Sequence, residues 1–219
     1  MSPIVRYESL LRMSSKNLYI NGCSFTYGHT LPREETWPKL LSDKLSCNLV
    51  NESKNGQSFQ SITFNSINTL SELNPENTIV IIGLTWEPRY MIQFGNETLD
   101  VSPSCLNSEQ HHEVKNVFAK YYKYLVENDK NLSENQHKNL ITNLISLQSF
   151  LKQNKFKYRI VNFIDQLKEM DLPIYNKLDK SKIINFRGDW RDLYIDDTSH
   201  PTKEGCVNIS EVIYDNINR

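Results

Sequence analysis

The sequence has few cysteines, and none of them form a CxxC pair. The four are widely spread along the chain, at Cys23, Cys47, Cys105 and Cys206. This spacing argues against a structural zinc site and against a thioredoxin-like redox motif. We therefore expect free thiols in a reducing compartment, which places the protein in the cytoplasm.

An excess of charge of either sign is also missing. Lys and Arg together number 25, Asp and Glu 26, so nothing indicates a nucleic-acid partner, which would call for a basic excess or stripe. No run approaches the roughly 20 apolar residues that cross a bilayer. The first residues, MSPIVRYESLLRMSSK, lack the apolar core of a signal peptide. From these absences we expect a protein that is neither inserted in a membrane nor secreted.

Helical and strand patterns alternate along the chain. Residues 78–84 (TIVIIGL) form a continuous β-branched run, typical of a central parallel strand covered on both faces. The alternation predicts a three-layer α/β/α sandwich with a mostly parallel, flavodoxin-like sheet of about five strands. Residues 1–16 are expected to form an N-terminal arm and residues 17–219 a single domain. The other expected strands are 16–21, 48–51, 157–163 and 183–186; the expected helices are 35–45, 59–73, 111–127, 133–153 and 202–217.

Residues 86–110 read as an irregular, polar loop that contains Trp86, Tyr90, Met91 and Phe94. Its position after the central strand leaves two interpretations open: a wall that selects substrate, or packing at the edge of the domain. Tyr121, Tyr122 and Tyr124 are expected to pack within a helix rather than to form a sugar platform. His111, His112 and Glu113 do not predict a metal site, because adjacent helical residues point in different directions.

Three short segments could carry chemistry, and each lies at the edge of the sheet where ligands bind. Ser24 follows the first strand between Gly22 and Gly28, in a turn that can expose its hydroxyl and N–H. Gly56 follows the second strand and lets the backbone approach a ligand closely. Asp197 precedes His200 by three residues, a spacing at which a carboxylate can orient an imidazole so that it accepts a serine proton.

The order of these segments resembles the SGNH/GDSL hydrolase superfamily. Its first block is matched by Gly22, Ser24, Thr26 and Gly28, its glycine block by Gly56, and its last block by Asp197, His200, Pro201 and Gly205. The pattern also looks like a divergent branch common in bacterial and phage genomes. The resemblance implies the SGNH hydrolase fold and a serine esterase with Ser24, His200 and Asp197 as its catalytic triad. It implies a small-molecule or carbohydrate ester as substrate, acetyl esters among them, and no metal or organic cofactor.

Two positions depart from the family pattern. Cys23 stands where the family has an aspartate, and Thr85 stands where the third block has an asparagine that donates to the oxyanion. The expected oxyanion hole therefore combines the Ser24 and Gly56 N–H groups with the Thr85 hydroxyl, with Trp86 and Arg89 as other candidate donors. Trp86, Arg89 and His29 are the candidate substrate-binding residues.

Other functions remain open at this point. An acyltransferase would use the same serine ester. The missing asparagine motivates a further alternative, a catalytically weak binding or structural module that keeps the fold. A nucleotide-binding flavodoxin-like protein is disfavoured because no GxGxxG or Walker sequence follows the first strand.

Overall fold

A computed structural model describes residues 16–103, 113–163, 167, 173–186, 195 and 200–218. Apart from Lys16, the expected N-terminal arm lies outside these residues. The main strands are β1 (Asn17–Asn21), β2 (Asn48–Asn51), β3 (Thr78–Gly83), β6 (Lys157–Asn162) and β7 (Ile183–Asn185). The helices are α2 (Ser24–Tyr27), α3 (Trp37–Leu45), α4 (Phe59–Leu70), α5 (Glu113–Asn128), α6 (Leu132–Gln153) and α8 (Lys203–Asn218).

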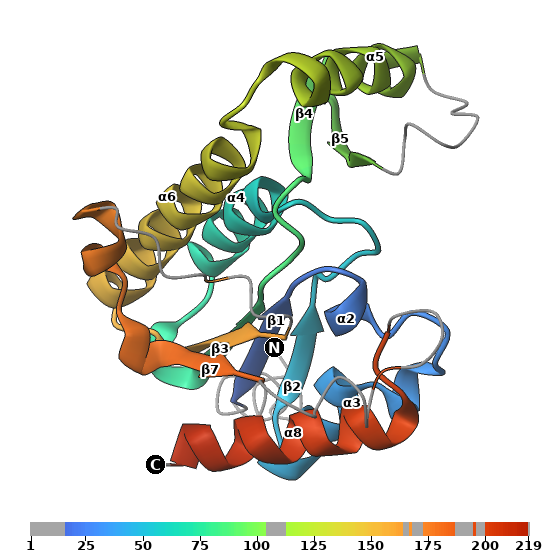
Figure 1. The fold of residues 1–219 in the computed structure, drawn as a ribbon. Coiled ribbons are helices and arrows are strands. Elements are labelled where there is room, and N and C mark those ends of the chain that lie inside the picture. Colours follow the sequence, from blue (N-terminus) through green and yellow to red (C-terminus); the bar gives the residue numbers. More distant parts are fainter. Residues whose placement is uncertain are drawn as a thin grey trace, which may run out of the picture.

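These five strands form one sheet in the order β2-β1-β3-β6-β7, and every pairing is parallel. The prediction of a five-stranded, flavodoxin-like parallel sheet is confirmed. The chain runs outward from β1 to β2 and then returns to the other side of β1 at β3 (Figure 1). The carboxyl ends of β1 and β3 therefore flank the switch point at which such sheets bind ligands.

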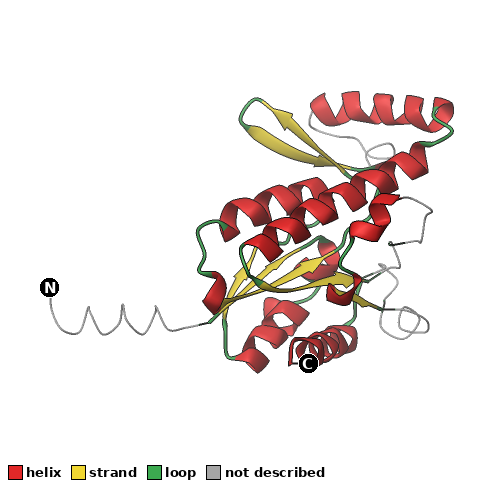
Figure 2. Ribbon diagram, turned by 90° about the vertical axis from the view of Figure 1, so that its left-hand side faces the viewer, coloured by secondary structure: helices red, strands yellow, loops and turns green. Residues whose placement is uncertain are grey.

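Two apolar layers sandwich the sheet, because successive strand residues point to opposite faces. Tyr19 and Val80 belong to the cluster beneath α4 and α6, whereas Leu18 and Ile81 belong to the cluster beneath α3 and α8. All four residues are fully buried. Figure 2 shows the sheet edge-on with helices on both faces, which is the predicted three-layer arrangement.

The prediction of an irregular loop at residues 86–110 is wrong for its described part. Strands β4 (Tyr90–Phe94) and β5 (Glu97–Val101) form an antiparallel hairpin that extends beyond the carboxyl edge of the main sheet (Figure 1). Gly95, at φ 59°, supplies the left-handed turn residue that joins them. The sequence feature that indicates this hairpin is the Gly95-Asn96 dipeptide, which lies between two segments of strand length.

Helix α5 covers the hairpin through a small apolar cluster of Val101, Phe118 and Tyr122. Tyr122 is buried as expected, but Tyr121 and Tyr124 are 57% and 60% exposed, so the packing prediction is wrong for these two. None of the described helices is long and apolar enough to cross a membrane.

Candidate active site

Ser24 is the first residue of α2, directly beyond the end of β1. Cys23 precedes it in an extended conformation, and α2 ends after one turn at Gly28, whose φ of 81° is left-handed. The Ser24 side chain is 7% exposed, and its backbone N–H bonds none of the described residues. Such unpaired N–H groups at the start of a helical turn are free to meet an external acceptor.

The turn around Ser24 is shaped by Thr26, which lies between two glycines. A Cβ atom on either Gly22 or Gly83 would come within 2.3 Å of the Thr26 hydroxyl oxygen. Real Cβ contacts are not this short, so glycine is required at the ends of both β1 and β3. This packing explains physically why glycine and threonine accompany the serine in the first block.

Asn21 anchors the same turn from below and is fully buried. Its Oδ1 accepts from the Gly22 N–H at 2.8 Å, and its Nδ2 donates to the Tyr19 hydroxyl at 3.2 Å. The Tyr19 hydroxyl in turn donates to Glu52 at 2.6 Å. Burial, followed by the hydrogen bond to Glu52, raises the pKa of Tyr19. A satisfied buried network of this kind holds the turn rigidly.

His200 reaches the same turn from the other end of the chain. Its ring centroid lies 5.6 Å from that of Phe25, the neighbour of Ser24, and 4.7 Å from that of His29. An antiparallel bridge between Ile195 and Pro201 shapes the segment before α8. Figure 1 shows the red segment before α8 rising beside the blue loop that follows α2. Asp197, the third predicted triad member, lies outside the described residues.

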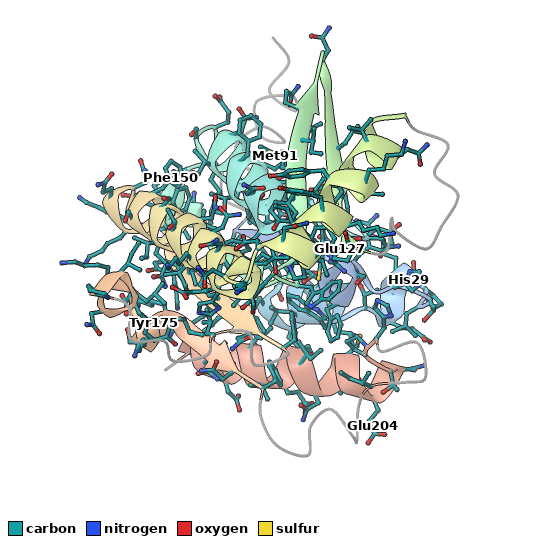
Figure 3. All side chains as sticks on the ribbon, turned by 45° about the horizontal axis from the view of Figure 1, so that its top comes forward. His29, Met91, Glu127, Phe150, Tyr175 and Glu204 are labelled. Atoms are coloured by element: carbon teal, nitrogen blue, oxygen red, sulfur yellow. The ribbon has the colours of Figure 1, made fainter. Side chains whose placement is uncertain are left out.

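His29 links His200 to the loop that carries Gly56. Its Nδ1 lies 3.0 Å from the side-chain nitrogen of Asn55, the residue before that glycine. Gly56 itself has a φ of 75°, and a Cβ built there would meet nothing within 4 Å. Gly56 is thus required by its backbone conformation and not by crowding, and it borders open space. Figure 3 labels His29, exposed on the loop after α2.

Thr85 does not have the free hydroxyl that the sequence suggested. Its Oγ1 donates to the Gln57 carbonyl at 2.8 Å and accepts from Arg89 Nη1 at 2.7 Å. A hydroxyl carries one proton, so this arrangement leaves Thr85 none to donate to an oxyanion. Thr85 instead ties together the end of β3, the loop after β2 and the start of the hairpin.

Cys23, which replaces the family's aspartate, fills space between two strand ends. It is 4% exposed, and its Sγ lies 3.9 Å from the Leu84 carbonyl oxygen. The prediction of free thiols is confirmed for the three cysteines that the structure describes, Cys23, Cys47 and Cys206. Burial raises the pKa of the Cys206 thiol to about 11, so that it stays protonated and unreactive near neutrality.

Trp86, a candidate substrate-binding residue, is 45% exposed shortly after the end of β3. A cavity of about 380 Å³ opens on the β2 side of α2, where Tyr27, Gly28 and Asn51 contribute to its wall. Within the part of the chain that the structure describes, no cluster of His, Cys, Asp and Glu is suited to hold a metal ion. The structure thus brings the loops of Ser24, Gly56, Thr85 and His200 to one edge of the sheet.

Neither a protein-family model nor a curated protein matches the sequence. Solved structures do match. An esterase, EstA, from Pseudoalteromonas sp. is 18% identical, with a TM-score of 0.53 over 93% of this chain and 97% of that one. A lipolytic G-D-S-L family protein from Veillonella parvula is 12% identical, with a TM-score of 0.53 over 94% and 100%. An acetyl xylan esterase, AlAXEase, is 13% identical, with a TM-score of 0.51 over 91% and 98%. The resemblance suggested by a few sequence positions therefore extends over nearly the whole chain, which has the fold of the SGNH/GDSL hydrolases.

Proposed function

We propose that this protein hydrolyses carboxylic esters, with Ser24 as nucleophile, His200 as general base and Asp197 as the residue that orients the imidazole. The observation that carries the proposal is the approach of the His200 ring to the Phe25 and His29 rings, at 5.6 and 4.7 Å. Residues 176 positions apart in sequence, Ser24 and His200, thereby share one edge of the sheet.

In this mechanism His200 takes the Ser24 proton as the serine oxygen attacks the ester carbonyl. Negative charge then develops on the carbonyl oxygen, and the Ser24 and Gly56 backbone N–H groups stabilise it. The protonated imidazole gives its proton to the departing alcohol. Water attacks the acyl-serine in the same way and releases the acid, so that the enzyme is restored without a cofactor.

The missing third donor predicts a slow enzyme. Removing one oxyanion donor typically lowers the rate by about 10²–10³. Since Thr85 has committed its proton to Gln57, the hole relies on two backbone groups unless a substrate brings Arg89 into contact with the oxyanion. For the substrate we propose small O-acyl groups, acetyl esters of carbohydrates among them, because an acetyl xylan esterase shares the fold.

Covalent labelling tests the nucleophile directly. The Pseudoalteromonas esterase is described as inhibited by monoethylphosphonate, and a fluorophosphonate probe uses the same phosphorus chemistry. We expect wild-type protein to be labelled at Ser24, as read by peptide mass spectrometry, and Ser24→Ala to be unlabelled. Ser71→Ala is the matched control, because Ser71 bonds its own helix at the end of α4, away from this edge.

Hydrolysis of p-nitrophenyl acetate tests the triad as a unit. Ser24→Ala and His200→Ala are each expected to lose at least about 10³-fold in kcat, and Asp197→Asn somewhat less. Circular dichroism and Tm should show that the variants are folded. Absence of label on folded wild-type protein would favour a binding module, whereas acyl transfer to an added sugar would identify an acyltransferase.

A further inference from the structure

The Arg89 guanidinium forms few hydrogen bonds with the described residues at the sheet edge that holds the proposed active site. Nη1 donates to Thr85 Oγ1 at 2.7 Å, and this is its one hydrogen bond in the part of the chain described. Nε is shielded from solvent and forms none. None of the described residues therefore binds the edge formed by Nε and Nη2, with which a guanidinium grips a carboxylate in two parallel hydrogen bonds.

The nearest acidic residue in sequence does not neutralise Arg89. Glu87 Oε1 lies 2.6 Å from Nδ1 of the buried His137 on α6, and Arg89 forms no ion pair with any described residue. Half-buried charges normally find a partner of opposite charge or several hydrogen bonds. A neutral threonine hydroxyl satisfies only a small part of what this guanidinium can bind.

The Gln57 side chain is a second polar group near Thr85 that forms no hydrogen bond with a described residue. Gln57 is fully buried, and neither Oε1 nor Nε2 of its side chain forms a hydrogen bond with a described residue. Its carbonyl is the acceptor of the Thr85 hydroxyl, so Arg89 and Gln57 are both attached to Thr85. Buried amides without partners are rare and call for an explanation. An acceptor group brought in by a ligand would satisfy donors of both side chains, Gln57 Nε2 and the Arg89 guanidinium, whereas Gln57 Oε1 requires a donor.

We propose that the substrate carries a carboxylate, and that Arg89 binds it beside the ester that Ser24 attacks. This inference rests on the proposed function and narrows it to acidic esters. Thr85 holds the guanidinium at the end of β3, and Cys23, adjacent to Ser24, contacts Leu84 at the same strand end. The threonine that replaces the family's asparagine thus orients a specificity residue instead of the oxyanion.

Paired substrates test this inference on both sides of the ester bond. On the acyl side, 4-nitrophenyl hydrogen succinate is compared with its methyl-capped form; on the alcohol side, acetoxyacetate is compared with acetoxyacetamide. We expect Arg89→Gln to lower kcat/KM for the charged member by about 10- to 100-fold more than for the neutral member of at least one pair. Lys157→Gln, which removes a positive charge from the opposite edge of the sheet, should leave every ratio unchanged.

A binding measurement separates this inference from the proposed function. N-acetylglycine, an amide analogue with a carboxylate, should raise the Tm of wild-type and Ser24→Ala protein but not of Arg89→Gln, whereas N-acetylglycinamide should raise none. A Ser24→Ala variant as active as wild type would overturn the proposed function alone. Equal losses on charged and neutral esters, with no Arg89-dependent Tm shift, would overturn the carboxylate site alone. A stronger Arg89-dependent shift with inorganic phosphate would assign the site to phosphate instead.

Discussion

The imidazole ring of His29 lies 4.7 Å from that of His200, centroid to centroid, while its Nδ1 faces the Asn55 side-chain nitrogen at 3.0 Å. One exposed histidine therefore connects the proposed base to the loop that presents the Gly56 N–H. Position and orientation of catalytic groups contribute strongly to rate. We therefore expect His29 to act as a positioning residue, in addition to its predicted place beside the substrate.

Replacing His29 should reveal this role. We expect His29→Ala to lower kcat for p-nitrophenyl acetate on the order of tenfold, because the His200 ring loses a packing surface. His29→Phe keeps an aromatic face without the Asn55 contact and should lose less. Steady-state kinetics of both variants, with Asn55→Ala as the matched partner, check the prediction. His29→Ala activity within twofold of wild type would contradict it.

The close packing around Thr26 predicts a coupling that can be measured. Gly83→Ala places a Cβ 2.3 Å from Thr26 Oγ1 and 3.1 Å from a Phe163 ring carbon, and should destabilise the fold by about 1–3 kcal/mol. In a Thr26→Ala background the same change should cost clearly less, since the clashing hydroxyl is gone. Urea unfolding of the four proteins gives the interaction energy. Strict additivity would show that the clash is relieved elsewhere.

Asp100 attaches the hairpin to the start of α4. Its Oδ1 accepts from the Ser58 N–H at 2.9 Å and from the Ser61 hydroxyl at 2.6 Å. A negative charge at a helix N-terminus is favourable, so Asp100→Ala should cost about 1–2 kcal/mol in unfolding free energy. Asp100→Asn retains an acceptor and should cost less. As a control, Asp43→Ala removes only a surface pair with Lys39 and should change stability by less than about 1 kcal/mol.

The buried hydroxyl of Tyr158 leads us to expect that the folded protein loses stability at alkaline pH. This hydroxyl is buried and forms no hydrogen bond with a described residue. Burial, then the Asp179 charge, raises its pKa from 10.0 to about 12. Below pH 10 the hydroxyl is protonated in folded and unfolded chains alike, so its contribution is intact. Between pH 10 and about 12 the unfolded chain ionises first, and stability falls.

The Tm of the Tyr158→Phe variant should therefore decrease less than the Tm of wild type when the pH is raised from 9 to 11. Near neutral pH the variant should be as stable as wild type or slightly more so, because an unpartnered hydroxyl is removed. The exposed Tyr121→Phe variant serves as the control. Parallel alkaline curves for wild type and Tyr158→Phe would refute the role of this hydroxyl.

The sheet was predictable because its signals are local. Residues 78–83 form an almost uninterrupted β-branched run, residues 157–162 end in a buried Ile-Val-Asn, and a glycine or asparagine is the last residue of each strand of the sheet. The hairpin escaped prediction because its strands are only five residues long, and the first of them, YMIQF, lacks the alternation of polar and apolar residues that indicates a strand. An exposed hairpin of this length depends on helix α5 for its apolar contacts, and sequence alone does not show that α5 packs there.

The meeting of the Ser24 and His200 segments followed from topology, since parallel strands bring their carboxyl ends to one edge. The role of Thr85 did not follow, because a threonine hydroxyl can donate to a ligand or to a backbone carbonyl with equal ease. The choice was made by Gln57 and Arg89, which reach Thr85 from different loops. Hydrogen bonds between loops are the part of a site that residue spacing conveys least.

The hairpin and α5 have their own small apolar cluster, separate from the two clusters that flank the sheet. Segments with few contacts to the main core open at a lower free energy than the whole protein unfolds. Amide hydrogens of β4, β5 and α5 should therefore exchange with solvent well before those of β1 and β3. The hairpin that follows Arg89 can then open while the strands beneath Ser24 keep their pairing.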